Sequence, residues 1–321
     1  MHKASIIWLN YNSMNFLDLA LKSLESFMNL NYDNYELIIV DNASTDGSFE
    51  KIVKYAETHK PNSVVVKYIQ ADRNLGYAGG MNIGWEARDP ESKYVAFVNN
   101  DLVAMPDSLA KLIESMEGDE RISVASGLIY SPDKTIYSAG WATDEILTAI
   151  SICGGKKPSD CPTASRSHEV TYADGAYLVA RVDVIRKYGF DGRPFIAETF
   201  LYADDSLLSI RLWNFGYASF YIPTEVGVHY VSSTTKRTGQ IKYYPIRAKF
   251  IAYKLIKVPY YYTINMYYIR VKIMSLILCK IGLQQYCIMY KAIKDGWELG
   301  SALRRRFGLL DLTKAPYVKV P

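Results

Sequence analysis

The 321 residues combine a large apolar fraction with a small positive net charge of +4, and both limit the class of protein. Apolar residues make up 49 %, enough to bury one large core or two smaller ones. No run of about 20 apolar residues is free of charges, and the N-terminus enters a strand-like run, which excludes a clear transmembrane helix and a signal peptide. The four cysteines lack metal-ligand spacing and predict reduced thiols in a cytoplasmic protein (Cys153, Cys161, Cys279, Cys287).

The charge is unevenly distributed along the chain. Residues 236–321 hold 17 Lys and Arg against 3 Asp and Glu, a balance of +14. Residues 1–235 hold 20 against 30, a balance of −10, and the two sum to +4. An acidic body followed by a basic, tyrosine-rich region predicts a C-terminal region that meets an anionic partner.

The first hundred residues alternate strand and helix signals. Apolar runs predict strands and helical spacing predicts helices (strands 4–10, 35–41, 63–70 and 93–100; helices 13–30, about 44–59 and about 77–88). Ser13 and then Ser44 or Thr45 are the expected N-caps. This alternation predicts a parallel sheet with helices on both faces, and ligands bind beyond the carboxyl ends of such strands. Asp41, Asn74 and Asp101 should therefore converge.

The later part of the chain is less regular. Residues 130–170 carry Gly, Ser, Pro and Lys with little periodicity and predict a loop-rich insertion. Regular structure resumes at residues 172–181. A helix is expected at about 204–215 and a strand at 217–223.

Asp101 ends a predicted strand in the sequence Asn99-Asn100-Asp101. A carboxylate there is a reasonable ligand for Mg²⁺ or Mn²⁺ bridging two phosphates, because hard cations prefer oxygen ligands. The alternative is a helix cap. His229 could complete the metal site or contact the diphosphate, although a lone histidine is more often structural.

Asp41 and a glycine-rich segment follow two other strands. Asp41 could accept from a uracil or thymine N–H or from ribose hydroxyls, and otherwise would be a turn residue. Glycines surround the next helix start, where backbone can approach an anion closely (Gly76, Gly79, Gly80, Gly84). The alternative explanation of these glycines is a tight loop and close packing of the helix, but the sequence alone shows no packing contact that would require them.

Asp204 and Asp205 precede a predicted helix. Two adjacent carboxylates at a helix start could simply complement the helix dipole. The functional alternative is a general base whose pKa is raised by its neighbour and by partial burial.

Together these segments resemble the family 2 glycosyltransferases, particularly a rhamnosyltransferase-like branch, over roughly residues 4–250. The segments that carry the resemblance are IIWLNYNS, VDNASTDGS, NLGYAGGMNIG, NND, YADGAYLVAR and YADDSLLSIRLWNFGY. This chain departs from the family at Asn99, where the metal motif usually has a first Asp, at Asp204, which replaces Glu, and at Leu207, where another acid is common.

The resemblance implies roles for individual residues. A nucleotide-sugar would be bound by the strand ends and the glycine-rich segment (Asn10, Tyr11, Asn12, Asp41, Asn74, Gly76, Gly79, Gly80, Asn82, Asn99, Asn100). The acceptor would lie near Asp174, Gly175 and Ala176. The catalytic candidates are Asp204 and Asp205, with Asp205 as the base, and the metal candidates are Asp101 and His229.

The implied fold is the α/β glycosyltransferase-A fold, a mostly parallel, doubly wound sheet with a helical C-terminal extension. Residues 1–235 would form the catalytic domain, with a nucleotide-binding half at 1–105 and an acceptor half at 106–235, and residues 236–321 the basic helical region. The implied activity is inverting sugar transfer, with Mg²⁺ or Mn²⁺, from a UDP- or dTDP-sugar to a glycan or lipid-linked acceptor.

Two other classes remain open. A nucleotidyltransferase would need a glycine-rich, basic loop after the first strand, which NYNSMN does not provide. A catalytically inactive binding protein of the same fold would have lost Asp101 or Asp205, and both are present. The apolar run at 271–290 suits a helix lying in the interface of an anionic membrane, consistent with a peripheral location at the inner face, or else packs on the catalytic domain or a second subunit of a homodimer.

Overall fold

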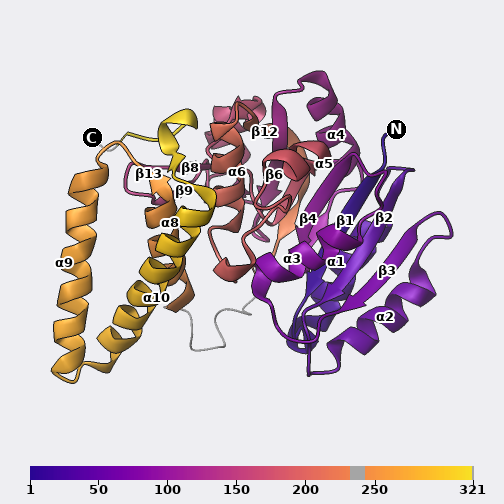
Figure 1. Cartoon of the computed structure of the whole chain (residues 1–321). Coiled ribbons are helices and arrows are strands. Elements are labelled where there is room, and N and C mark those ends of the chain that lie inside the picture. The colour runs from indigo at the N-terminus through magenta and orange to yellow at the C-terminus, as the bar shows by residue number, and fades with distance from the viewer. Residues whose placement is uncertain (232–242, 320–321) are drawn as a thin grey trace.

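The computed structural model describes residues 1–231 and 243–319, and within them ten strands form one mixed sheet (Figure 1). The backbone path across the sheet is β10-β12-β6-β11-β4-β1-β2-β3, while β5 pairs with β12 and β7 with β6. Its strands are β1 (Ala4–Asn10), β2 (Tyr35–Asp41), β3 (Val65–Gln70), β4 (Tyr94–Asn99), β5 (Leu102–Ala104), β6 (Ile122–Tyr130), β7 (Ile136–Ser138), β10 (His168–Glu169), β11 (Tyr177–Arg181) and β12 (Ala218–His229).

Parallel pairing joins β3, β2, β1 and β4, while β11 runs antiparallel to both β4 and β6. Two small sheets pair β8 (Trp141–Thr143) with β9 (Ala149–Ser151) and β13 (Ile256–Lys257) with β14 (Leu310–Asp311). The α-helices of residues 1–231 are α1 (Leu17–Met28), α2 (Ser48–His59), α3 (Gly76–Ala87), α4 (Ser108–Gly118), α5 (Val182–Tyr188) and α6 (Asp204–Asn214).

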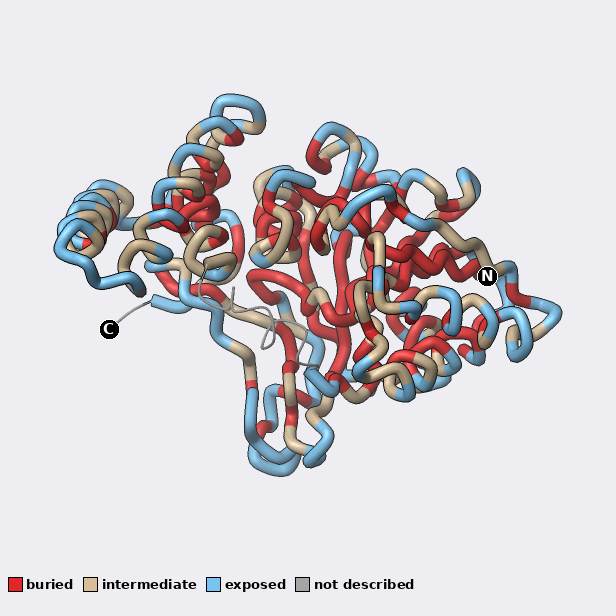
Figure 2. The backbone as a smooth tube through the Cα atoms, turned by 90° about the horizontal axis from the view of Figure 1, so that it is seen from below, coloured by how far each residue is buried: buried red, intermediate tan, exposed pale blue. Residues whose placement is uncertain are grey.

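Both faces of the sheet are covered, and the central strands β1, β2 and β4 are mainly apolar and buried for that reason. Along β1, Ile6 and Trp8 pack in a core with α1, α2 and α4, whereas Ile7 packs in a second core with α3, α5 and α6. Side chains of a strand alternate between faces, so this one-residue step places every second residue in the other core. Figure 2 shows the resulting buried strands surrounded by exposed helical turns.

The predicted elements of the first hundred residues are present, with differences at helix starts. The segment from residue 13 begins with a 3₁₀ turn (Met14–Phe16), and the Ser13 hydroxyl donates to Asn10 Oδ1 (2.6 Å) without capping a helix. Helix α2 begins only at Ser48, whose N–H donates to Asp46 Oδ1 (3.0 Å). The predicted strand at 217–223 continues through Pro223 to His229.

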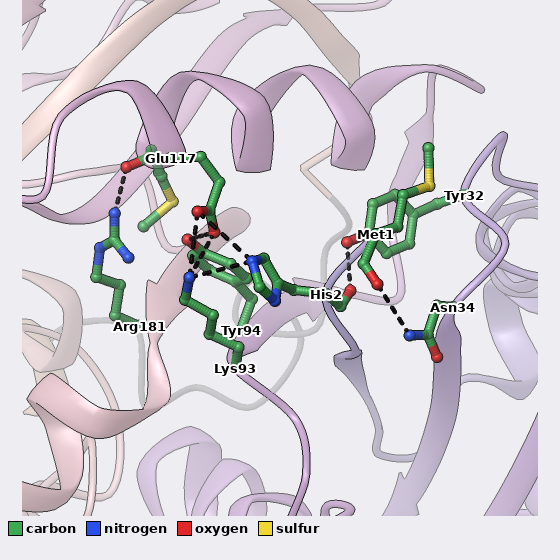
Figure 3. A network of polar contacts seen from close by, with 9 residues as sticks. Met1, His2, Tyr32, Asn34, Lys93, Tyr94, Glu117 and Arg181 are labelled. Carbon is green, nitrogen blue, oxygen red and sulfur yellow. Dashed lines mark hydrogen bonds and ion pairs between the residues drawn. The ribbon is translucent and has the colours of Figure 1, made fainter.

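A polar network holds the amino ends of the parallel strands (Figure 3). Lys93 Nζ lies 2.9 Å from Glu117 Oε1, and the Tyr94 hydroxyl donates to the same carboxylate. Arg181 Nε donates to the Ile122 carbonyl (2.9 Å). These contacts fix α4 to the starts of β4 and β6, on the edge opposite the candidate site.

The basic C-terminal region is helical, as predicted, and shares a core with the catalytic half. It contains α8 (Tyr243–Leu255), α9 (Tyr261–Lys280) and α10 (Gln284–Phe307). Leu207 and Ile210 of α6 pack with Phe250 and Ile251 of α8 in one buried cluster. The predicted boundary at residues 235 and 236 lies outside the described residues.

The apolar run at 271–290 is two helices rather than one. Gly282 has φ +92°, in the region that favours glycine, and there the chain turns from α9 into α10. Among the described residues, every helix falls short of the length and apolar character needed to cross a bilayer.

The expectation of four reduced thiols is wrong. The structure pairs Cys153 with Cys161 and Cys279 with Cys287. The loop after β9 and the α9–α10 turn bring the paired Cα atoms to 6.0 and 4.7 Å, within the range of a disulfide. The predicted cytoplasmic location rested partly on reduced thiols and loses that support.

Candidate active site

Hydrogen bonds join the carboxyl ends of three parallel strands. Asn10 Nδ2 at the end of β1 donates to Asp41 Oδ1 at the end of β2 (2.8 Å). Asn100 Nδ2, beyond β4, donates to Asn10 Oδ1 (3.2 Å), and Asn42 Nδ2 donates to Asn74 Oδ1 (3.0 Å). The predicted convergence of Asp41, Asn74 and the Asp101 segment at one edge is therefore observed.

Asp41 is completely buried and organises the turn after β2. Its carboxylate accepts from Asn10, from the hydroxyl (2.6 Å) and the N–H (2.9 Å) of Ser44, and from Gln70 Nε2 (3.3 Å). Tyr11 and Asn12 lie at the same edge of the sheet, and both are partly exposed. A direct contact of Asp41 with a nucleotide stays a prediction, while its hold on the surrounding loop is observed.

Close packing accounts for most of the glycine-rich segment. A Cβ on Gly79 would lie 2.6 Å from Leu75 Cβ, and one on Gly80 would lie 2.5 Å from Leu9 Cδ1. Gly84 would meet Ile7 Cγ2 at 2.3 Å. Asn82 is buried and donates to the Phe195 carbonyl (2.8 Å). These residues seat α3 on the sheet, as the packing alternative expects, while their contact with a nucleotide-sugar stays a prediction.

Gly76 has a different neighbour, the loop that carries the catalytic candidates. It begins α3 with φ +69°, and a Cβ there would lie only 2.1 Å from the Phe200 carbonyl oxygen. Three residues of that loop also have positive φ: Phe200 (69°), Tyr202 (71°) and Ala203 (64°). Such backbone is uncommon outside glycine and is found where the surrounding structure holds it, often at functional sites.

Asp205 follows this loop and faces the segment predicted to bind the acceptor. Its Oδ2 accepts from the Gly175 N–H (3.2 Å) and its Oδ1 from the Ser206 N–H (2.8 Å). Asp174, beside it, accepts from Trp141 Nε1 (2.6 Å) and from the Ala176 N–H (2.9 Å). Loss of hydration, and then the charge of Asp174, raise the pKa of Asp205 to about 7.

Asp204 is buried beneath the loop. Burial, reinforced by the charge of Asp205, raises its pKa to about 8 despite a hydrogen bond with Thr199. The Thr199 hydroxyl also donates to the Ile196 carbonyl (2.6 Å). The same hydroxyl donates to Asp204 Oδ1, so its one proton is shared between two acceptors, and the raised pKa favours the neutral carboxyl of Asp204 at neutral pH. Asp204 therefore supports the loop and leaves Asp205 as the accessible carboxylate.

Asp101 and His229 are brought together by the pairing of β5 with β12. His229 Nε2 lies 3.1 Å from Asp101 Oδ1, and both residues are buried. Burial lowers the pKa of His229, but the hydrogen bond to Asp101 and the charges of Asp101 and Asp174 together outweigh it, and the net shift is upward. The Tyr137 ring meets the imidazole edge-on at 4.7 Å.

A cavity of about 530 Å³ connects these groups. Asp205, Asp174 and His229 line it together with Asn99, the end of β4. Its walls are largely aromatic and apolar, and residues of α8 close one side (Tyr77, Tyr137, Trp141, Tyr172; Ala248, Lys249, Ala252). The site thus places the carboxylate of Asp205, whose pKa is raised, and the imidazole of the Asp101–His229 pair on one cavity.

The sequence profile described as glycosyl transferase family 2 matches residues 5–189, more than half of the chain. The chain belongs to glycosyl transferase family 2. It is 24 % identical over 221 residues to the N-acetylglucosaminyl-diphospho-decaprenol L-rhamnosyltransferase of Mycobacterium tuberculosis, covering 63 % of this chain and 68 % of that protein. The predicted family and its rhamnosyltransferase-like branch are confirmed.

Other family 2 relatives match over shorter stretches. An uncharacterized glycosyltransferase of Haemophilus influenzae is 28 % identical over 119 residues, covering 37 % of this chain. The chain spans about a third of the length of that relative, 34 %. In fold, the chain resembles a mannosyltransferase from Pyrobaculum calidifontis solved with GDP-Man and Mn²⁺, with a TM-score of 0.56 at 17 % identity over 94 % of this chain and 86 % of that one. The predicted glycosyltransferase-A fold is confirmed.

The family's divalent metal fits Asp101 and His229 by donor chemistry. His229 Nε2 faces Asp101 Oδ1, so an ion held by both side chains would take the place of that hydrogen bond. The buried His229 Nδ1 has no hydrogen-bond partner among the described residues. The described residues contain no group of three or more His, Cys, Asp or Glu that could hold a metal. Two protein donors are compatible with a cation that also takes oxygens from a diphosphate and water.

Several cavity residues were missed from the sequence. Tyr77 donates from its hydroxyl to the Gly175 carbonyl (3.0 Å) and so ties α3 to the acceptor segment. The ring of Trp141, from the region predicted only as loop, stacks on Tyr172 with centroids 5.9 Å apart. Lys249 comes from the C-terminal region. Aromatic residues amid Gly and Ser were a weak signal for the first group, and Lys249 had none.

Gly76→Ala should damage both stability and transferase activity, whereas Gly216→Ala should affect stability modestly. Both glycines have positive φ, +69° and +84°, so both substitutions carry a backbone cost of about 1–2 kcal/mol. Only at Gly76 would the added Cβ overlap another residue, Phe200. That overlap either destabilises the fold by about 1–3 kcal/mol more or displaces the loop before Asp205. Denaturant melts and turnover measure the two effects. Equal losses of stability and turnover in the two variants would contradict a role for the contact between Gly76 and Phe200.

Proposed function

We propose that this chain is an inverting glycosyltransferase that moves a sugar from a UDP- or dTDP-sugar to a glycan or lipid-linked acceptor. The observation that carries the proposal is the carboxylate of Asp205, which faces the cavity with a pKa of about 7. A base with a pKa near the working pH balances the fraction that is ionised against its strength as a proton acceptor.

In the proposed reaction Asp205 takes the proton of an acceptor hydroxyl as that oxygen attacks the anomeric carbon. The new C–O bond forms while the bond from the anomeric carbon to the diphosphate oxygen breaks, and the diphosphate leaves with the electron pair. The N–H groups of Gly175 and Ser206 hold the carboxylate in place. A single displacement of this kind inverts the anomeric carbon and needs no covalent enzyme intermediate.

The donor side of the proposal uses the strand ends. Asn99 and Asn100 offer amide groups at the carboxyl edge, while the buried Asn10 is bonded to Asp41. Asp41 in turn holds the loop that contains Tyr11 and Asn12 through Ser44. Asp101 and His229 would hold Mg²⁺ or Mn²⁺. When bound, the cation would stabilise negative charge on the departing diphosphate as a Lewis acid.

The acceptor side supports a sugar linked to an anionic lipid. Stacked Trp141 and Tyr172 offer an apolar wall for a sugar ring. Among the described residues that line the cavity, Lys249 is the only Lys or Arg, and it would suit a phosphate on the acceptor. The rhamnosyltransferase of Mycobacterium tuberculosis is named for a diphospho-linked lipid acceptor, which agrees with this chemistry.

Asp205→Asn should lower turnover about a hundredfold or more, the usual scale for loss of a general base, with little change in donor binding. Asp204→Asn is the matched control, because an amide can replace a protonated carboxyl beneath the loop. The assay is release of nucleoside diphosphate over a panel of nucleotide-sugars and acceptors. Near-normal turnover of Asp205→Asn would remove the assignment of the base.

The pH profile should report Asp205 directly. The base acts when deprotonated, so kcat/KM in the wild type should fall as the pH drops through about 7. Asp174→Asn removes a neighbouring negative charge, which should lower the pKa of Asp205 and move the acidic limb to lower pH. Glu114→Gln, an exposed change on α4, should leave the limb in place. If the acidic limb of the kcat/KM profile stays at the same pH in Asp174→Asn, the charge of Asp174 does not raise the pKa of Asp205.

Chelation should abolish transfer, and added Mn²⁺ or Mg²⁺ should restore it. Asp101→Asn should raise the Mn²⁺ concentration needed for half-maximal activity and weaken Mn²⁺ binding measured by calorimetry with the nucleoside diphosphate present. Asp107→Asn, an exposed neighbour on the chain, is the control. Full activity in excess chelator would show that Asp101 has another role.

A further inference from the structure

Helix α9 exposes a large apolar surface. Of the large hydrophobic side chains that are exposed among the described residues, more than half lie between residues 260 and 288. They are Tyr260, Tyr262, Met266, Tyr267, Ile269, Ile273, Met274, Ile277, Ile281, Leu283 and Ile288. An exposed apolar patch of this density marks an interaction site in most proteins.

The exposed residues form one face of the helix. Tyr262, Met266, Ile269, Ile273 and Ile277 follow one another at spacings of three or four, so they share one side. Tyr268 and Ser275, on the other side, are buried where α9 packs on its neighbours. Helix α9 is the outermost of the three C-terminal helices in Figure 1, and its outer turns are mainly exposed or intermediate in Figure 2.

The charge of this face has a single sign. Arg270 and Lys280 are exposed on α9, and Lys291 and Lys294 are exposed on α10. The sequence from residue 236 to 294 contains no Asp or Glu. Apolar residues interspersed with cations complement a surface that is apolar within and anionic at its boundary.

We propose that α9 lies on an anionic lipid bilayer, with Tyr262, Met266, Ile269, Ile273 and Ile277 in the acyl boundary and Arg270 and Lys280 at the phosphate level. A helix of this kind lies in the interface plane, because it is not apolar enough to cross. Tyrosines such as Tyr260 and Tyr267 suit the headgroup level. Docking rests on this face alone and stands whether or not the proposed sugar transfer is correct.

Docking would also bring the cavity close to a lipid-linked acceptor. Helix α10 packs on both α9 and α8, and α8 closes one side of the cavity with Ala248, Lys249 and Ala252. Gly296 and Gly300 of α10 permit close contact with α8, since a Cβ on either would lie within 3.0 Å of α8 backbone or side-chain atoms. The docking face and the cavity wall therefore belong to one packed unit.

The test is co-sedimentation of the full chain with phosphatidylcholine vesicles, with and without phosphatidylglycerol, at low and high salt. The wild type should bind the anionic vesicles at low salt and be released by salt. Ile273→Glu with Ile277→Glu should lower the partition coefficient at least about tenfold. Val65→Glu with Val318→Glu makes the same charge change at exposed positions elsewhere and should retain most binding.

Arg270→Gln with Lys280→Gln should remove most of the preference for anionic vesicles, by about tenfold or more, because each cation near the surface contributes to that attraction. Thermal melts confirm that each variant is folded. The proposal is overturned if the folded wild type stays in the supernatant at low salt. It is also overturned if light scattering shows a dimer that Ile273→Glu with Ile277→Glu dissociates, since a second copy would then cover the face.

Discussion

The site depends on one constraint, the removal of water from the carboxylate of Asp205 while its ionised form is still held by backbone N–H groups. Enclosure and the nearby charge of Asp174 raise its pKa to about 7, and the Gly175 and Ser206 N–H groups limit that rise. The loop before it adopts three non-glycine positive φ angles, and Gly76 lies against Phe200 to hold it. Local strain is thus stabilised by packing of α3, which is itself seated on β1 by small residues.

The C-terminal region forms part of the wall of the candidate site. A charge imbalance of +14 predicted a separate basic region, yet α8 shares a core with α6 and closes the cavity. Arg247 of α8 donates to the carbonyls of Thr199 (2.7 Å) and Glu198 (2.8 Å), in the turn that supports Asp204. We infer that acceptor preference depends on α8 as well as on the loops of the catalytic half.

Sequence reasoning predicted the parallel half of the sheet well, because strands buried on both faces are continuous apolar runs, and β1 and β2 have the predicted bounds. It also predicted the convergence at the carboxyl edge. It did not foresee the close packing of Gly79, Gly80 and Gly84, because their neighbours Leu75, Leu9 and Ile7 are visible only in three dimensions. Trp141 and Tyr172 escaped for a similar reason, since long-range pairing brings them together. The cysteine pairs depended on turns that no local pattern specified.

In the proposed mechanism Asp205 is the base of a direct displacement at the anomeric carbon, without a covalent enzyme intermediate. The most direct measurement is the configuration of that carbon in the product, determined by NMR on material released before any rearrangement, against its configuration in the donor. The proposed mechanism predicts that the configuration of the anomeric carbon is inverted. Retention would contradict it, because two displacements or a front-face reaction would then be required, and Asp205 could not be the base that this geometry supports.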